Sequence, residues 1–300
     1  MNDILFAYGI PKETVNGIMM LYKNTRSLVR LPEGDTSFFY ITPGVLQGDT
    51  LAPSIFIICL NYVLLRKAID EKLDLGSTLI QRRSRRHPAK KISDTDYADD
   101  IASLTDCIKD AEATLHSVEK LAKVIDLFDN ATKTRIICLN QNAGSGINSL
   151  NGEIIDLEND LKYLGSFIAS TERDFNIRLE EAWAALNRMN NIWKSNLPHQ
   201  LKRNFFRATV QSVLVYGSIS WTLTSSLEKK IDGSYTRMLG AALNKSWIDH
   251  LSNAYLYGNV PCVTATIRQQ RLRFTGHCWR SINELSSELL LWEPSHGKRS

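Results

Sequence analysis

Two aspartates, Asp99 and Asp100, stand side by side in DTDYADDIASL (residues 94–104), a stretch that otherwise has a β-strand pattern. Adjacent like charges repel each other, and adjacent side chains of a regular strand point to opposite faces. The two carboxylates can therefore serve one site only where the backbone turns sharply. The flanking segments SDTDYA and IASL predict two short strands, joined by a two-residue hairpin turn at Asp99 and Asp100.

A turn with two carboxylates suits either a cation site or a solvated structural role. Divalent cations held by carboxylates assist phosphoryl transfer, and Mg²⁺ prefers oxygen ligands. Acidic turns are also common in purely structural settings, so the spacing alone leaves both roles open. A calcium-binding loop is excluded, because counting from Asp94 places Asp99 at the required glycine and Thr105 at the closing glutamate.

The chain changes its pattern near residue 170, from short strands mixed with helices to helices alone. A helix starting at Pro53 is apolar nearly all round, so we expect it to be deeply buried. Strand-to-helix segregation predicts an α+β fold with a boundary at residue 170. Before that boundary the pattern predicts helices through Tyr8, after Pro11, over 53–69 and over 111–125, a hairpin over 27–41, and strands at 135–139 and 161–168.

Charge is distributed unevenly between the two parts. Residues 1–170 hold 19 Lys and Arg against 22 Asp and Glu, a net of −3, whereas residues 171–300 hold 17 against 10, a net of +7. A basic half suggests a polyanionic partner, although it is equally compatible with a solvated helical domain. We expect no membrane span, because the longest apolar run, residues 54–65, is too short and is broken by Asn61.

Four stretches occur in a fixed order: GVLQGDTLAP (44–53), YADD (97–100), KT (133–134) and KYLGS (162–166). This series resembles the reverse transcriptases of non-LTR (LINE-type) retrotransposons. RRSRRHP, ahead of the acidic turn, is similar to one branch of that family. The resemblance extends to the family's thumb and post-thumb region through RLEEAWAALNRMNNIW, VQSVLVYGSISWTL, LSNAYLYG and RQQRLRFTGHCWRS.

The resemblance implies a fold, a reaction and partners. Residues 1–170 are expected to form an incomplete polymerase palm, a small antiparallel sheet with packed helices, and 171–283 a helical thumb and post-thumb region, followed by a tail at 284–300. The implied reaction is RNA-directed DNA synthesis with Mg²⁺, or alternatively Mn²⁺. The implied partners are an RNA template, a DNA primer and deoxynucleoside triphosphates, and nothing in the sequence indicates an oligomeric state.

The resemblance also assigns roles around the acidic turn. Asp99 and Asp100 match the metal-binding carboxylates of the family's catalytic hairpin. Tyr97 and Ala98 match positions beside the primer end and the incoming nucleotide.

Roles are likewise implied for two further motifs. Gln47 and Gly48 match the loop that touches template and nucleotide, and an amide and a glycine suit such close approach. Lys133 matches a lysine near the leaving pyrophosphate, acting as general acid or as charge stabilisation. An ordinary turn and a solvated lysine are the structural alternatives for these motifs.

Tyr163, Leu164 and Gly165 match the primer grip, a turn that holds the primer strand. Because aromatic and aliphatic residues favour strands anyway, a plain core strand is the alternative.

In the basic half, Arg268, Arg271 and Arg273 suit contact with a phosphate backbone, and a solvated face is the alternative. Trp183 and Trp193 lie on an apolar helical stripe and are expected in the core instead. His277 lacks a second pair of ligands and is not expected to bind a metal.

The family's palm has a third catalytic carboxylate, on a strand that would precede the start of this sequence. We expect that neither Asp94 nor Asp96 replaces it, so the chain reads as an N-terminally truncated, inactive fragment of the polymerase. The alternatives are a non-catalytic nucleic-acid-binding protein derived from it and, last, a metal-dependent phosphodiesterase. Within VIDLFDNATKT, Asp126 and Asp129 depart from the family's usual residues.

Localisation follows from the termini and cysteines. MNDILFAYGIPKE has no secretory-signal pattern, and the five cysteines form no C-x-x-C pair. We expect an intracellular protein, and the resemblance implies the nucleus.

Overall fold

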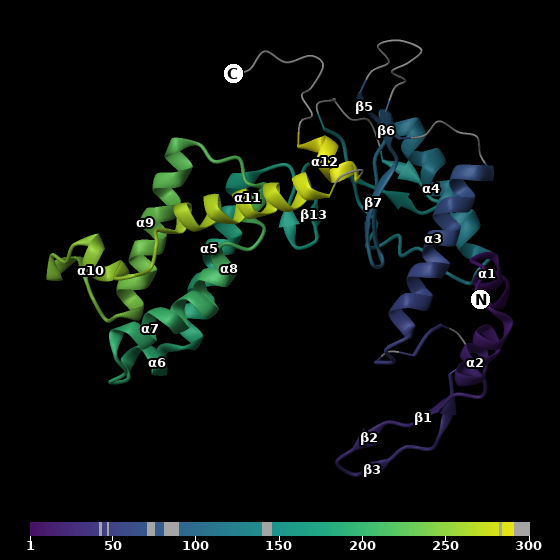
Figure 1. Ribbon diagram of the computed structural model, residues 1–300, viewed down its shortest axis with the longest axis horizontal. Coiled ribbons are helices and arrows are strands. Elements are labelled where there is room, and N and C mark those ends of the chain that lie inside the picture. The colour runs from purple at the N-terminus through teal and green to yellow at the C-terminus, as the bar shows by residue number, and fades with distance from the viewer. Residues whose placement is uncertain are drawn as a thin grey trace. The chain divides into compact units, whose positions relative to one another are not determined.

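The computed structural model describes residues 1–41, 44–46, 48–70, 76–80, 90–139, 146–281 and 284–290 (Figure 1). The chain divides into two compact units, Met1–Leu157 and Glu158–Glu293. The first mixes helices with short strands and the second is mainly helical, which confirms the predicted α+β fold class.

Short helices and strands alternate in the first unit. Its helices are α1 (Asn2–Ala7), α2 (Lys12–Tyr22), α3 (Ala52–Asp70) and α4 (Ile108–Lys123). Its strands are β1 (Arg26–Ser27), β2 (Arg30–Leu31), β3 (Gly34–Asp35), β4 (Phe39–Tyr40), β5 (Ser77–Ile80), β6 (Lys90–Ile92), β7 (Asp94–Tyr97), β8 (Asp100–Ser103), β9 (Ile136–Ile137), β10 (Ile147–Asn148) and β11 (Ile154–Ile155), with β12 (Leu157–Glu158) at the boundary between the units.

The second unit opens with one hairpin and continues in helices. The hairpin strands are β13 (Lys162–Tyr163) and β14 (Ser166–Phe167). The helices are α5 (Thr171–Arg188), α6 (Asn190–Lys194), α7 (His199–Phe206), a π-helical turn (Arg207–Gln211), α8 (Ser212–Leu214), a 3₁₀ turn (Ser218–Ser220), α9 (Ser225–Ala242), a 3₁₀ turn (Trp247–Asp249), α10 (Asn253–Tyr257), α11 (Val263–Arg280) and α12 (Leu285–Leu289).

In the described part of the chain each sheet is small and has two strands. The pairs β1–β4, β2–β3, β5–β6, β7–β8, β10–β11 and β13–β14 are antiparallel, as predicted. The pairs β1–β4 and β2–β3 form the predicted hairpin over 27–41. Residues 161–168 form a second hairpin, β13–β14, so the prediction of a single strand there is wrong. Gly165 and the preceding Leu164 reverse the chain, because both adopt positive φ.

Helix α3 corrects another expectation. It packs against α1 and α4 along one side, where Ala52, Ile55 and Val63 are buried. Its opposite side is exposed, and Ile57 keeps 52% of its surface accessible. The prediction of deep burial all round is therefore wrong, since an apolar helix is buried only where other elements cover it.

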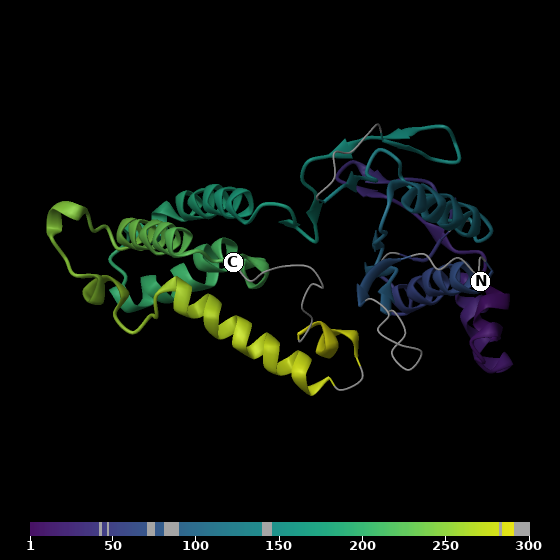
Figure 2. The same ribbon diagram turned by 90° about the horizontal axis from the view of Figure 1, so that it is seen from above.

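The large hydrophobic core belongs to the second unit, where α5, α7, α9 and α11 pack together (Figure 2). Phe175 of α5 meets Trp221 edge to face, with ring centroids 5.8 Å apart. Trp193 is buried in this core and Trp183 packs against it, which confirms their predicted core positions. The indole N–H of Trp193 donates to the carbonyl of Leu186, so its polar atom is satisfied.

None of the helices that the structure describes combines the length and the apolar character that a membrane crossing requires.

The neighbouring residues Phe205 and Phe206 offer a matched test of this core. Phe206 is completely buried and stacks edge to face on Tyr235 at 5.3 Å, whereas Phe205 is 40% exposed. We expect Phe206→Ala to lower the free energy of unfolding by about 3–5 kcal/mol, because it leaves a cavity. Urea titration followed by tryptophan fluorescence measures this loss, and Phe205→Ala should cost less than half as much. Equal losses would contradict the packing described here.

Candidate active site

The acidic hairpin consists of β7 and β8, which pair from Asp94 opposite Ser103 to Tyr97 opposite Asp100. Its two-residue turn is Ala98–Asp99, and Asp100 is the first residue of β8. The expected turn at Asp99 and Asp100 is therefore wrong by one residue. The hairpin itself is confirmed, and it places the two aspartates at its tip, where both are exposed.

Ala98 adopts a left-handed conformation, with φ of 56°. Positive φ in a two-residue hairpin turn is typical of the primed turn types, which favour glycine, asparagine or aspartate. An alanine there costs about 1–2 kcal/mol of backbone energy. Such strain is found at functional sites more often than elsewhere.

The register fixes which carboxylates share a face. Tyr97 and Asp100 are directly opposite each other, so their side chains lie on the same face of the hairpin. Asp96 lies opposite Ile101 and points to the other face, as does Asp94 two residues earlier. Neither residue can join Asp100 on its face, which agrees with the expectation that they do not replace a missing ligand.

The chemistry of the tip suits a hard divalent cation. Asp99 and Asp100 offer carboxylate oxygens, the ligands that Mg²⁺ prefers. Within the described residues, no group of three or more His, Cys, Asp or Glu side chains is arranged to hold a metal ion. The chemistry of these two carboxylates therefore fits a divalent cation.

The loop before α3 contains Gly48, which is exposed and has φ of 91°. Gln47 lies outside the described residues. Asp49 fixes the loop, because it accepts hydrogen bonds from the Tyr22 hydroxyl at 2.7 Å and the Leu51 amide at 3.2 Å. The Tyr22 hydrogen bond lowers the pKa of Asp49, while burial and Asp49 raise the pKa of Tyr22 to about 12. Sequence reasoning missed this pair, since nothing in the pattern links residues 27 positions apart.

Lys133 is exposed in a turn that follows α4, where its amide donates to the carbonyl of Asn130 at 2.8 Å. Asp126, in the same connection, has φ of 57°. Aspartate tolerates this left-handed conformation better than most residues, and glycine adopts it freely. The departure from the family's usual residue at Asp126 is therefore compatible with the local fold.

The turn between β13 and β14 is the second candidate element. Leu164 and Gly165 have φ of 47° and 85°, the pattern of a type I′ turn. Among the described residues other than glycine that have positive φ, only Ala98 and Leu164 are apolar. Ala98 lies one residue before the turn that the sequence predicted, and Leu164 lies in the segment that was matched to the primer grip.

Side chains from the helical part hold this turn by its backbone. The Tyr216 hydroxyl donates to the Leu164 carbonyl at 2.9 Å, and the Arg178 guanidinium donates to the Gly165 carbonyl. The guanidinium also lies 4.5 Å from the centre of the Tyr216 ring. Since both turn carbonyls accept from these side chains, α5 and the segment after α8 help to hold the turn.

A buried carboxylate supports the same turn. Asp174 is 1% exposed and accepts from the Phe167 amide at 3.1 Å and the Trp221 indole at 2.7 Å. Gly217 has φ of 71°, and a Cβ there would overlap the hydroxyl of Ser166. Sequence reasoning did not identify Asp174, Arg178, Tyr216 and Gly217 as functional. The tyrosine–glycine pair in VLVYGSISW was the available signal, because glycine marks close approach of the backbone.

The three arginines of α11 do not form one surface. Arg268 is paired with Glu228 at 2.5 Å, and Arg271 donates to the backbone carbonyls of Ser218 and Trp221. Arg273 is exposed, and its position in the helix points it away from Arg271. Arg268 is exposed but ion-paired, whereas Arg273 is exposed with no acidic partner shown among the described residues.

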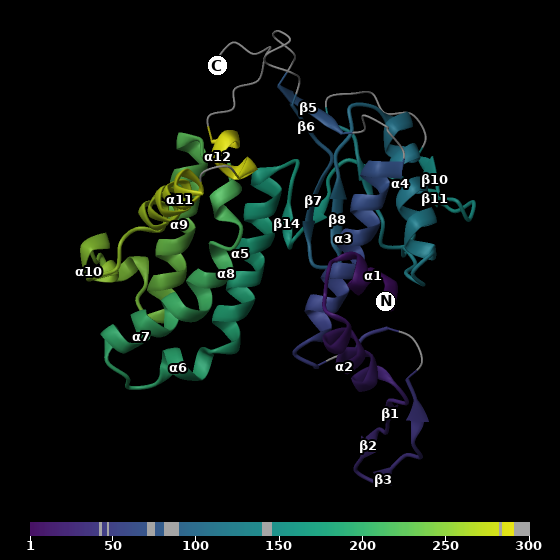
Figure 3. The same ribbon diagram turned by 45° about the vertical axis from the view of Figure 1, so that its right-hand side comes forward.

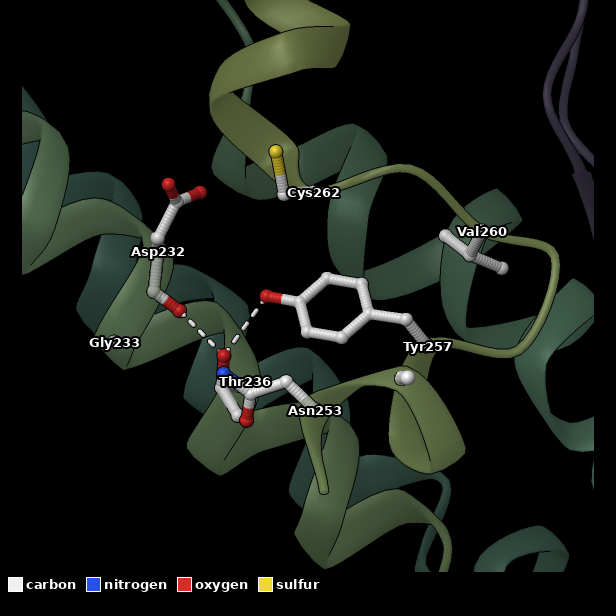
Figure 4. Close-up of a pocket in the computed structure, with 8 residues that line it drawn as sticks. Asp232, Gly233, Thr236, Asn253, Tyr257, Val260 and Cys262 are labelled. Atoms are coloured by element: carbon white, nitrogen blue, oxygen red, sulfur yellow. Dashed lines mark hydrogen bonds between the residues drawn. The ribbon is translucent and has the colours of Figure 1, made fainter.

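A cavity of about 400 Å³ lies elsewhere in the second unit (Figure 4). The Tyr257 hydroxyl is 2.8 Å from the Thr236 hydroxyl, and burial raises the pKa of Tyr257. Asp232 accepts from the amide and the hydroxyl of Thr264 and so stabilises the start of α11. The cavity is lined by Asp232, Gly233, Thr236, Asn253, Ala254, Tyr257, Val260 and Cys262, so no predicted site residue takes part in it.

Comparison with known proteins bears on the first unit and on the start of the second. The family model described as reverse transcriptase (RNA-dependent DNA polymerase) matches residues 3–168. This span contains both candidate turns, and more than half of the chain lies within it. No curated protein matches the chain.

Two glycines provide a test of the contacts around the β13–β14 turn. We expect Gly217→Ala to lower the free energy of unfolding by at least about 1 kcal/mol, because of the left-handed φ and the overlap with Ser166. Gly233→Ala, inside α9 with open space around it, should instead raise stability by about 0.5–1 kcal/mol. Urea denaturation of both variants checks the prediction. A stabilising Gly217→Ala would show that the segment does not approach the turn closely.

Proposed function

The chain belongs to the reverse transcriptase family of RNA-dependent DNA polymerases, and from this premise we propose that Asp99 and Asp100 are metal-binding carboxylates of its polymerase site. The family acts on nucleic acid and uses divalent metal ions. The observation that carries the proposal is the reversal at Ala98–Asp99, which brings two adjacent carboxylates to one exposed hairpin tip.

We propose Mg²⁺ as the ion, with Mn²⁺ as a substitute. Bound there, the ion would stabilise the charge that develops as a primer hydroxyl attacks a nucleotide phosphate. Tyr97 shares a face with Asp100 and is 67% exposed, so it can contact the primer end or the nucleotide. Lys133 is exposed and would offer a proton or a positive charge to the leaving pyrophosphate. Gln47 and Gly48 would contact the template and the nucleotide.

The β13–β14 turn, with Tyr163, Leu164 and Gly165, is proposed as the element that holds the primer strand. Its support is the anchoring of both turn carbonyls by Arg178 and Tyr216. A primer end must be held to within a fraction of an ångström, because a shift of about 1 Å can cost 10²-fold in rate. A turn fixed by two side chains suits that task better than a free loop.

Within the reverse transcriptase family, we assign the chain to the polymerases of non-LTR retrotransposons. This assignment rests on the order of the motifs, on RRSRRHP ahead of the acidic hairpin, and on the similarity of segments after residue 170. Residues 1–170 would then be palm and 171–283 thumb and post-thumb.

We further propose that the 300-residue chain does not extend a primer unaided. The family's site uses a third carboxylate from another strand, and the register turns Asp94 and Asp96 away from the face of Asp100. Two carboxylate ligands position a cation poorly, because the cation's other coordination positions are not fixed by the protein.

A second candidate is non-catalytic nucleic-acid binding by the helical unit. The observation that favours it is the large hydrophobic core. All residues of this core belong to the second unit, so the packing of the helical unit does not depend on the polymerase site. Residues 171–300 also carry a net charge of +7, and Arg273 faces solvent. This binding needs no metal site, so it would survive the loss of polymerase activity.

Primer extension and primer–template binding, measured together, test these proposals. With Mg²⁺ or Mn²⁺ we expect no extension by this chain. We expect weak binding whose affinity falls about tenfold between 50 and 200 mM salt, as two neutralised phosphates would produce. Arg273→Ala should make this salt dependence shallower by about one phosphate contact.

Asp99→Ala serves as the control for the extension assay. Extension that this substitution abolishes would refute the proposed inactivity while establishing the metal site. Salt-independent binding would refute the phosphate contacts of the basic half.

A further inference from the structure

The hairpin formed by β1–β4 carries a surface that the proposed site does not use. Arg26 lies opposite Tyr40 and Ser27 opposite Phe39. Tyr40 therefore shares a face with Arg26, while Phe39 points to the other side. Phe38 precedes β4, and its contact with Arg26 places it beside the same face. The Arg26 guanidinium lies 5.5 Å from the centre of the Phe38 ring. We call Arg26, Phe38 and Tyr40 the aromatic face.

The aromatic face is open to solvent. Phe38 is 64% exposed and Tyr40 is 65% exposed. Every residue from 29 to 40 is exposed. The hairpin extends from the end of α2 away from α1 and α3 (Figures 1 and 3). A two-stranded hairpin is at best marginally stable alone in water. Aromatic side chains that stay exposed on it therefore indicate a surface for a ligand or a partner molecule.

The charges around this face favour a polyanion. Residues 23–31 and 36–41 contain Lys23, Arg26 and Arg30 but no aspartate or glutamate. The acidic residues of the hairpin, Glu33 and Asp35, are confined to its tip, where Asp35 pairs with Arg30 at 3.2 Å. With Arg30 paired at the tip, the half that carries the aromatic face holds Lys23 and Arg26 and no acidic residue, so it is cationic.

We propose that the aromatic face binds single-stranded nucleic acid by stacking Phe38 and Tyr40 on unpaired bases. Exposed rings beside cations are the pattern of surfaces that bind single strands without reading their sequence. Arg26 adds a planar guanidinium that can stack on a base or contact a phosphate. A duplex offers such rings no base faces along its length, so the ligand is the unpaired part of a template.

This inference deepens the proposed function, because it takes the bound strand to be a template of the same polymerase. Its test uses neither primer nor metal, so a chain that fails to polymerise can still succeed in it. The assay is fluorescence anisotropy of the full chain with a labelled 12-nucleotide single strand. A second strand of the same length, in which every base is replaced by an abasic residue, retains the phosphates but cannot stack.

We expect the base-bearing strand to bind at least about fivefold more tightly than the abasic strand. Phe38→Ala and Tyr40→Ala should each remove much of that preference. Phe39→Ala, on the opposite face of the same strand, should keep it, and so should Phe38→Tyr, which retains a ring.

Equal binding of the two strands by the wild-type chain would overturn the proposal. The proposal would also be overturned if Phe39→Ala lost as much of the preference for the base-bearing strand as Phe38→Ala. The two faces of the hairpin would then contribute equally to binding. If Phe38→Ala leaves strand binding intact and instead converts an oligomer to a monomer in sedimentation, the face is a protein interface and the proposal is wrong.

Discussion

The reversal of the chain at Ala98–Asp99 is the constraint on which the candidate site depends. Neighbouring residues of a strand face opposite ways, so Asp99 and Asp100 could not act together in an uninterrupted strand. The structure resolves this by putting Asp99 in the turn and Asp100 at the first position of β8. The positive φ of Ala98 is the energetic cost of that arrangement. The same reversal decides which other carboxylates are excluded, because it places Asp96 on the opposite face.

A second reversal of the chain, at Leu164–Gly165, also uses positive φ, but side chains from other elements hold it in place. Its backbone is held from outside, by Tyr216 and Arg178, and a buried carboxylate at Asp174 connects the adjoining strand to Trp221. Asp174 and Arg178 project from α5, one of the helices of the large core, and Trp221 is part of that core. The helical unit thus has a structural role that needs no contact with substrate, which is to hold one turn in place.

Much of this could be predicted from local pattern. The helices, the acidic hairpin and the core positions of Trp183 and Trp193 follow from hydrophobic spacing and turn chemistry, which act over a few residues. The turn was misplaced by one residue, because Ala98 is not a residue type that signals left-handed backbone. The exposed side of α3 and the internal pairing of Arg271 depend on which elements pack together. The Tyr22–Asp49 and Tyr216–Leu164 hydrogen bonds join residues 27 and 52 positions apart, beyond the reach of any local rule.

Cation binding at the acidic hairpin tests whether Asp99 and Asp100 form a metal site. Mn²⁺ binding to the full chain, measured by electron paramagnetic resonance, can be compared between Asp100→Asn and Asp96→Asn. These variants remove one charge each from opposite faces of the same hairpin. If the turn builds the metal site, Asp100→Asn weakens binding by at least about tenfold, as loss of a ligand should, while Asp96→Asn leaves it nearly unchanged. Equal effects of the two substitutions would contradict this proposal, because the attraction would then be general charge and not a site built by the turn.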